Sequence, residues 1–157
     1  MSGGLRTVEV TVDGIAAPPW RRRLPRFCAR ALSAFGAERW EIAILLCGDA
    51  RITELNGRFR GKPRPTDVLS FPRDDGAEST AVFGDLAVCL DALHRNAERF
   101  GVPDDEELKR LVVHGLLHLA GMDHGRGKGR KMLTLQEGLL GRLGSERIMA
   151  RTGRGSS

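Results

Sequence analysis

The sequence predicts a single α+β domain in which a mixed sheet of about four strands is covered by helices. Strand-like and helix-like segments are interspersed along the chain, which is typical of this class. The length of 157 residues suits one domain, and 41% hydrophobic residues are enough to build one core. We therefore expect one domain over residues 1–157, with a mobile tail from about Arg147.

The first half of the chain predicts two strands, each followed by a helix. Residues 7–12 (TVEVTV) alternate between apolar and polar side chains, as a half-buried strand does. Residues 20–35 place an apolar stripe opposite an arginine-rich face, and regular helix is expected from about Pro25. The nearly continuous apolar run at 40–48 predicts a central strand, and Asp49 suits the N-cap of the short helix that follows.

The second half predicts two short strands and three helices. The strands are expected at 67–71 and 84–90, on either side of a turn-rich connection, and a helix is expected at 91–100. A helix over 104–120 would begin with four carboxylates, which are stabilised at the positive end of the helix dipole. A final helix over 129–143 would cover the core.

Three of the four histidines lie in the run HGLLHLAGMDH, at His114, His118 and His124. The first two are one helical turn apart, so their imidazoles share a face about 6 Å apart along the axis. Gly121 suits the end of that helix, and the turn after it would bring in the third imidazole. Three neutral nitrogen ligands with an open fourth position are typical of a catalytic zinc. We predict one zinc ion per chain, bound on this helix and the turn after it.

The same run matches the metzincin protease motif HExxHxxGxxH at every fixed position except one. Gly115 stands where those proteases have a glutamate that takes a proton from the metal-bound water. A glycine has no group for that step, so the motif disfavours peptide hydrolysis by that route. A metalloprotease-like hydrolase that recruits its base from elsewhere is one alternative.

The formal net charge of +5 is concentrated in three basic clusters. If the fold brings the two clusters that flank the histidine chemistry in the sequence together, they would attract a polyanion. Aromatic residues make up only 5%, so recognition of a nucleic-acid backbone is expected rather than stacking on an aromatic platform. The clusters are Arg21, Arg22, Arg23, Arg26 and Arg30; Arg58, Arg60, Lys62 and Arg64; and Arg126, Lys128, Arg130 and Lys131.

The cysteines and the lengths of the apolar segments indicate the cellular compartment of the protein. Cys28, Cys47 and Cys89 are odd in number, far apart and surrounded by apolar neighbours, which indicates reduced, buried thiols rather than disulfides. The sequence has no apolar stretch of about 18 residues and no signal-peptide pattern at its N-terminus. We expect a cytoplasmic protein that does not bind membranes.

Two further segments precede the histidine run. They are LNGRFRGKPRPTDVLSFP, from Leu55 to Pro72, and GDLAVCLD, from Gly84 to Asp91. In the order and spacing of these two segments and the histidine run, the chain from about Trp40 to Leu140 resembles the YbeY family of bacterial single-strand-specific endoribonucleases.

The resemblance implies a zinc-dependent hydrolase of single-stranded RNA. The family's metal-binding histidines correspond to His114, His118 and His124, and its functional arginine corresponds to Arg60, the predicted catalytic residue. The resemblance further implies ribosomal RNA processing, with maturation of the 3′ end of small-subunit ribosomal RNA, and ribosome quality control. Ribosomal RNA and small-subunit ribosomal proteins are the implied partners.

The chemistry of the basic residues is consistent with that reading. The planar guanidinium of Arg60 matches two phosphate oxygens and stays charged, although an ordinary surface ion pair is the other interpretation. The predicted additional RNA contacts are Arg58, Lys62, Arg64, Arg126 and Lys128. Because a three-histidine site can also be purely stabilising, a second alternative is a non-catalytic ribosome-assembly factor with a structural zinc.

Overall fold

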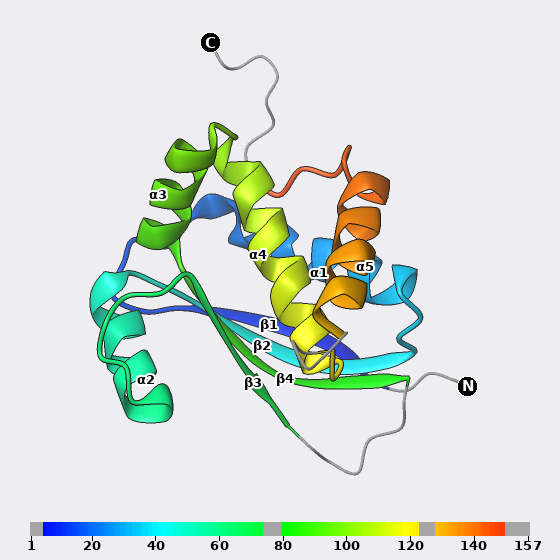
Figure 1. Cartoon of the computed structure of the whole chain (residues 1–157), viewed down its shortest axis with the longest axis horizontal. Coiled ribbons are helices and arrows are strands. Elements are labelled where there is room, and N and C mark those ends of the chain that lie inside the picture. Colours follow the sequence, from blue (N-terminus) through cyan, green and yellow to red (C-terminus); the bar gives the residue numbers. More distant parts are fainter. Residues whose placement is uncertain (1–4, 74–79, 123–127, 150–157) are drawn as a thin grey trace.

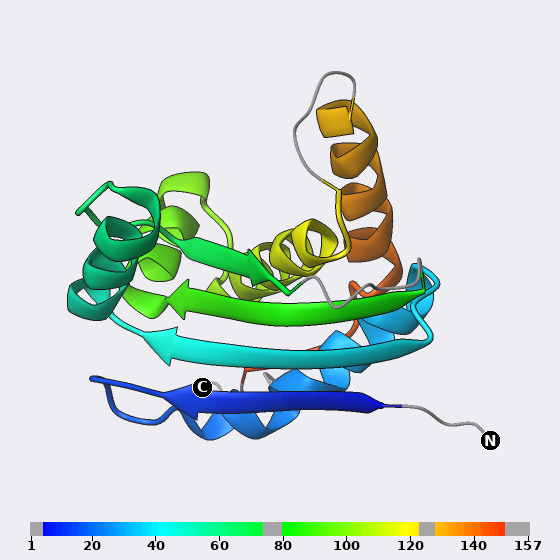
Figure 2. The same ribbon diagram turned by 90° about the horizontal axis from the view of Figure 1, so that it is seen from below.

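The computed structural model describes residues 5–73, 80–122 and 128–149. Its strands form one mixed sheet in the order β1-β2-β4-β3 (Figures 1 and 2). The first three strands in that order are parallel, and β3 runs antiparallel to β4 at the edge. The bounds are β1 (Arg6–Val12), β2 (Arg39–Cys47), β3 (Val68–Pro72) and β4 (Ala81–Cys89).

Five α-helices and one short 3-10 helix connect and cover these strands. The 3-10 helix Pro19–Arg23 leads directly into the first α-helix. The predicted α+β class and four-stranded mixed sheet are confirmed. The α-helices are α1 (Leu24–Ala34), α2 (Asp49–Arg60), α3 (Leu90–Phe100), α4 (Asp104–Leu119) and α5 (Lys128–Arg142).

The main core lies on one face of the sheet, under α1, α4 and α5 (Figure 1). Alternate residues of β2 point into it, among them Trp40, Ile42 and Ile44, which are almost completely buried. From α4, Leu108, Val112 and Leu116 fill the same core, all with no exposed surface. The alternation of residues along β2 is typical of a strand with two distinct faces.

A smaller apolar cluster covers the opposite face, where α2 packs at one end of the sheet (Figure 1). Ile52 and Leu55 of α2 contact Leu69 and Ala87 of the two neighbouring strands. Beyond α2 this face carries an apolar depression of about 410 Å³. Helices therefore cover the two faces unequally, and α4 lies on the face that carries the main core.

The start of α2 differs from the sequence prediction. Gly48 occupies the N-cap position, and Asp49 is the first helical residue instead of the cap. The cause is tertiary: the carboxylate of Asp91 accepts a hydrogen bond from the backbone N–H of Asp49 at 3.0 Å. The side chain of Asp49 is then held by both terminal nitrogens of Arg95, at 2.9 Å each.

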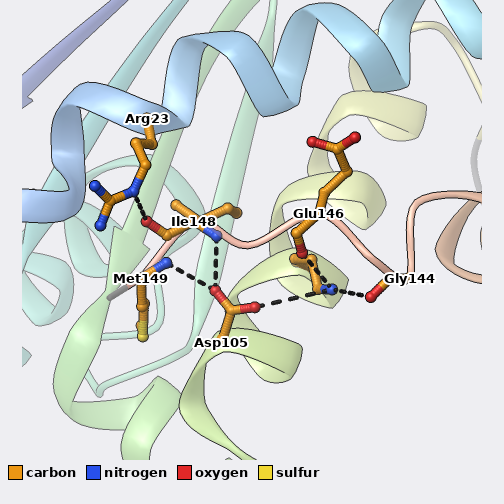
Figure 3. A network of polar contacts seen from close by, with 7 residues as sticks. Arg23, Asp105, Gly144, Glu146, Ile148 and Met149 are labelled. Carbon is orange, nitrogen blue, oxygen red and sulfur yellow. Dashed lines mark hydrogen bonds and ion pairs between the residues drawn. The ribbon is translucent and has the colours of Figure 1, made fainter. Parts of the chain in front are cut away.

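The C-terminal segment is anchored to the start of α4 (Figure 3). The Asp105 carboxylate accepts hydrogen bonds from the backbone N–H groups of Ile148 and Met149, at 2.9 and 2.8 Å. The buried Lys109 ammonium donates to the carbonyl oxygens of Gly144 and Glu146, at 3.3 and 3.0 Å. Carboxylates at the start of α4 thus have tertiary partners in addition to the helix dipole.

The expected tail from about Arg147 therefore includes residues that the structure holds in place. Ile148 is completely buried, and its carbonyl accepts a hydrogen bond from Arg23 Nε at 2.8 Å. Residues 150–157 lie outside the described part of the chain, so the remainder of that prediction stays a prediction. None of the described helices is both long and apolar enough to cross a membrane.

Gly84 allows α4 and β3 to approach β4 closely. A Cβ atom added there would lie 2.7 Å from the backbone oxygen of Phe71 and 2.6 Å from Leu119 Cδ2. A backbone atom cannot move aside as the end of a side chain can, so the position excludes any residue larger than glycine.

Gly84→Ala should therefore lower the free energy of unfolding by at least the roughly 1–3 kcal/mol typical of overpacking. Gly138→Ala is the matched control, because Gly138 is exposed in α5 and an added Cβ would meet nothing within 4 Å. It should raise stability by about 0.5–1 kcal/mol, since alanine favours helix. Denaturant titration of both variants measures the difference, and equal stabilities would contradict this account of the close approach.

Candidate functional site

One face of α4 lines the cleft that contains two of the predicted metal ligands. Glu107, Arg110, His114 and His118 follow one another at three- or four-residue spacing and so project from the same side of the helix. The cleft has a volume of about 670 Å³. Its other walls come from α2, β3, α3 and α5, through Arg60, Asp67, Val68, Ser70, Asn96, Arg99, Phe100, Leu133 and Gln136.

The rings of His114 and His118 lie together, with centroids 4.7 Å apart. His114 Nδ1 is 2.9 Å from the amide oxygen of Gln136, a buried residue of α5. An amide oxygen accepts, so this contact suits a proton on Nδ1 and leaves Nε2 for a metal. Two imidazoles on adjacent turns, one of them held by a buried amide, fit a zinc site.

The turn after α4 begins as predicted: the helix ends at Leu119, and Gly121 follows with a positive φ of 92°. His124, the third predicted ligand, lies outside the described residues, so the three-histidine set stays a prediction.

Gly115 has a structural reason for being a glycine. It is buried where α4 crosses β4, and an added Cβ would lie 2.7 Å from Leu86 Cδ2 and 3.1 Å from its Cδ1. Leu86 is itself 1% exposed and packed in the main core. A glutamate at this position would have to displace the buried Leu86 side chain, which disfavours the metzincin mechanism itself. The alternative that recruits its base from elsewhere does not need a side chain at this position.

Arg60 lines the same cleft as the two histidines, although it is far from them in the sequence. It is the last residue of α2, which ends at Gly61 in the left-handed conformation with φ of 71°. Its Nη2 donates to the Ser70 carbonyl at 3.4 Å, and it has no ion pair with a carboxylate of residues 5–73, 80–122 or 128–149. An exposed guanidinium of this kind can bind an anion.

The other predicted RNA contacts lie outside the lining of this cleft or outside the described chain. Arg58, Lys62 and Arg64 are exposed around the end of α2, and the Arg58 guanidinium lies 5.6 Å from the ring centroid of Phe59. Arg126 falls outside the described residues. Lys128 begins α5, but its side chain is not among those described. Their RNA contacts remain predictions.

The structure adds a polar network that the sequence analysis missed. Asn96 of α3 donates to the carboxylates of Asp67 at 3.0 Å and of Glu107 at 3.1 Å. Glu107 is 2% exposed and also accepts from Arg110 Nε at 3.1 Å. The sequence analysis assigned Glu107 only to the first turn of a helix. Its spacing of seven residues from His114 was the available signal that both share one face.

A second group of potential metal ligands lies away from this cleft. Asp49, Cys89 and Asp91 place ligand atoms within 4.8 Å of one another, so the group could hold a metal ion. Its carboxylates already have partners, however, and the hydrogen bonds from Arg95 lower the pKa of Asp49. Burial raises the pKa of Cys89 to about 12, which keeps the thiol protonated and disfavours a thiolate ligand.

The cysteines agree with the sequence analysis, and the fourth histidine, His94, lies outside the cleft. His94 is exposed, and its hydrogen bond with Asp104 raises its pKa. Cys28, Cys47 and Cys89 are buried free thiols. Burial raises the pKa of Cys28 to about 12 and that of Cys47 to about 11.

Comparison with known proteins identifies the family. The model of the family described as Endoribonuclease YbeY matches residues 12–144. An Endoribonuclease YbeY of Treponema pallidum is 40% identical, covering 85% of this chain and 87% of the relative. The Endoribonuclease YbeY of Aquifex aeolicus is 37% identical, covering 77% of this chain and 82% of the relative.

A solved structure has the same fold. The solution structure of TM1509 from Thermotoga maritima matches 96% of this chain and 100% of that chain, with 27% identity and a TM-score of 0.62. Together with the family match and the identity of the sequence relatives, this shows that the chain belongs to the YbeY endoribonuclease family.

Proposed function

We propose that this chain is a zinc-dependent endoribonuclease that cleaves single-stranded RNA. One zinc ion would be held by His114, His118 and His124. The observation that carries the proposal is that His114, His118 and an arginine without a described ion pair, Arg60, line one cleft. Membership of an endoribonuclease family supplies the reaction class.

The biological role follows the family. We infer that the substrate is ribosomal RNA, that the reaction includes maturation of the 3′ end of small-subunit ribosomal RNA, and that it serves ribosome quality control in the cytoplasm. Small-subunit ribosomal proteins are the inferred protein partners. The formal net charge of +5 favours a polyanionic substrate.

Each described side chain has a distinct task in this proposal. Zinc bound at the histidines would supply a Lewis acid and lower the pKa of water. Gln136 holds the ring of His114 through Nδ1, which keeps Nε2 directed away from α5 for coordination. Arg60 binds the scissile phosphate and stabilises the negative charge that grows on its oxygens.

The two alternatives differ from this proposal in observable ways. A metalloprotease-like enzyme would recruit its base from elsewhere in the chain, because Gly115 has no side chain to act as one, and it would cleave peptides. A non-catalytic assembly factor would bind RNA and zinc without cutting any single strand. The exposure of Arg60 in the histidine cleft favours the nuclease, because a purely structural metal site needs no anion-binding group beside it.

The metal ligands are tested by zinc content. Loss of a hydrogen bond to a metal ligand typically lowers metal affinity by roughly 10- to 100-fold. His118→Ala should lower zinc affinity by more than this, because it removes a direct ligand. Cys89→Ala is the control from the second ligand group and should keep about one zinc per chain. Elemental analysis after dialysis against a chelator gives both values. Zinc retained by His118→Ala and lost by Cys89→Ala would assign the metal to Asp49, Cys89 and Asp91.

The role of Gln136 is tested separately. Gln136→Leu should weaken zinc binding by about 10- to 100-fold, because the N–H of His114 loses its acceptor and the ring is no longer held. Gln136→Glu keeps an acceptor at the same place and should retain the affinity. Chelator competition measures binding, and ¹⁵N NMR of the His114 ring reports which nitrogen carries the proton. Equal affinities in Gln136→Leu and the unmodified protein would remove Gln136 from the site.

Catalysis is tested at Arg60. Arg60→Ala should lose roughly 10²-fold or more in single-turnover cleavage of single-stranded RNA while its zinc content stays unchanged. Arg60→Lys should recover only part of the lost cleavage rate, since a point charge does not reproduce the bidentate guanidinium. Arg26→Ala removes the same charge from an exposed position on α1 and should cleave normally.

Two outcomes would contradict the proposal. Equal cleavage by Arg60→Ala and Arg26→Ala would exclude Arg60 from catalysis. A fully metallated protein that cuts no single-stranded RNA would favour the assembly factor.

A further inference from the structure

The cleft continues beyond the histidines to an exposed aromatic ring. Four large apolar side chains are exposed in the described part of the chain, and two of them, Phe100 and Leu133, line this cleft. Phe100 ends α3 and is 49% exposed. Because Phe100 lies in the histidine cleft, its exposed ring is available to a ligand that enters the cleft.

Two guanidinium groups flank this ring. The carbon of the Arg110 guanidinium lies 5.2 Å from the ring centroid of Phe100, and that of Arg99 lies 5.7 Å from it. Arg110 is held in place through Nε by the buried Glu107. Arg99 has no ion pair with a carboxylate in the part of the chain that the structure describes. Aromatic rings beside arginines form the usual sites at which proteins stack the bases of single strands.

The charges in the cleft separate a place for phosphate from a place for a neutral group. At Arg60 a guanidinium without an ion pair to a described carboxylate faces the cleft. Near Phe100 the guanidinium groups of Arg99 and Arg110 and the carboxylates of Asp67 and Glu107 lie in the same part of the lining, so their charges largely offset one another. A base carries no charge at neutral pH, so it fits over Phe100 better than a phosphate does.

The aromatic ring also lies close to the histidines along α4. Arg110, whose guanidinium lies beside Phe100, and His114 are four residues apart, which is about 6 Å along the helix axis. A base on Phe100 would therefore belong to a nucleotide close to the one at the histidines.

We propose that Phe100, with Arg99 and Arg110, forms a stacking site for one base of single-stranded RNA beside the metal ligands. This inference rests on the proposed endoribonuclease function and gives it a means of selecting single strands, because a base in a duplex has no free face. The low aromatic content predicted recognition of the backbone rather than base stacking, and the proposal modifies that prediction, because one ring in the cleft is sufficient for a single base. Purines should bind more tightly than pyrimidines because their faces are larger.

The test compares a chain of phosphates that carries bases with one that does not. The first probe is fluorescently labelled 2′-O-methyl oligoadenylate, checked on a gel for integrity, and the second is inorganic polyphosphate used as a competitor. Phe100→Ala should weaken oligoadenylate binding by about 5- to 150-fold and leave the polyphosphate affinity unchanged. Phe100→Trp should retain or increase the affinity for oligoadenylate. Phe100→Leu, which keeps apolar bulk without an aromatic face, should lose most of it.

Phe59→Ala is the matched control. Phe59 is 57% exposed and also has an arginine beside its ring, but it lines the depression on the opposite face of the sheet. This variant should bind oligoadenylate normally, and thermal unfolding verifies that each variant is folded.

The possible failures are distinguishable. Oligoadenylate affinity that is unchanged in both Phe100→Ala and Phe100→Leu, while the unmodified protein still cuts single-stranded RNA, would overturn the stacking site and leave the proposed function standing. Equal loss of oligoadenylate and polyphosphate would also overturn it, by showing a general charge or folding effect. An unmodified protein that binds neither probe and cuts no RNA would overturn both proposals.

Discussion

The close packing of α4 on the sheet is the constraint on which the rest of the structure depends. At Gly115 the helix backbone comes so near β4 that an added Cβ would lie 2.7 Å from the buried Leu86 side chain. The residues on either side of Gly115 lie in different environments. Leu116 and Val112 enter the core, while His114 and His118 face the cleft. The position that carries the base in metzincin proteases here serves packing instead.

Polar contacts from two helices then hold the exposed face of α4 in position. Gln136 reaches His114 from α5, and Asn96 reaches Glu107 from α3. A buried polar group without a partner costs free energy of folding. Each of these contacts therefore also favours the observed arrangement of the helices over slightly different ones. The cleft is thus an arrangement of several elements around one rigid helix, which is a more precise support for reacting groups than a loop.

Residues with strong local signals were predictable from the sequence. The alternation in β1, the apolar run of β2 and the histidine spacing of α4 each depend on a period that a short segment reveals. Partnerships between distant segments were not predictable in this way. Nothing local shows that Asp91 would take the capping role expected of Asp49, or that Gln136 would meet His114. Arg60 was found only through a family resemblance, since an arginine at a helix end is common. His124 lies where the structure describes no residues.

The anchoring of the C-terminal segment has a consequence for biosynthesis. Arg23, near the beginning of the chain, donates to the carbonyl of Ile148, and Asp105 at the start of α4 binds the same stretch. A ribosome delivers Arg23 long before Ile148, so this contact cannot form until the segment after α5 has been synthesised. The wall of the cleft that α5 provides also follows the other walls in the order of synthesis. The cleft is therefore completed only after the helices and strands that form its other walls have been made.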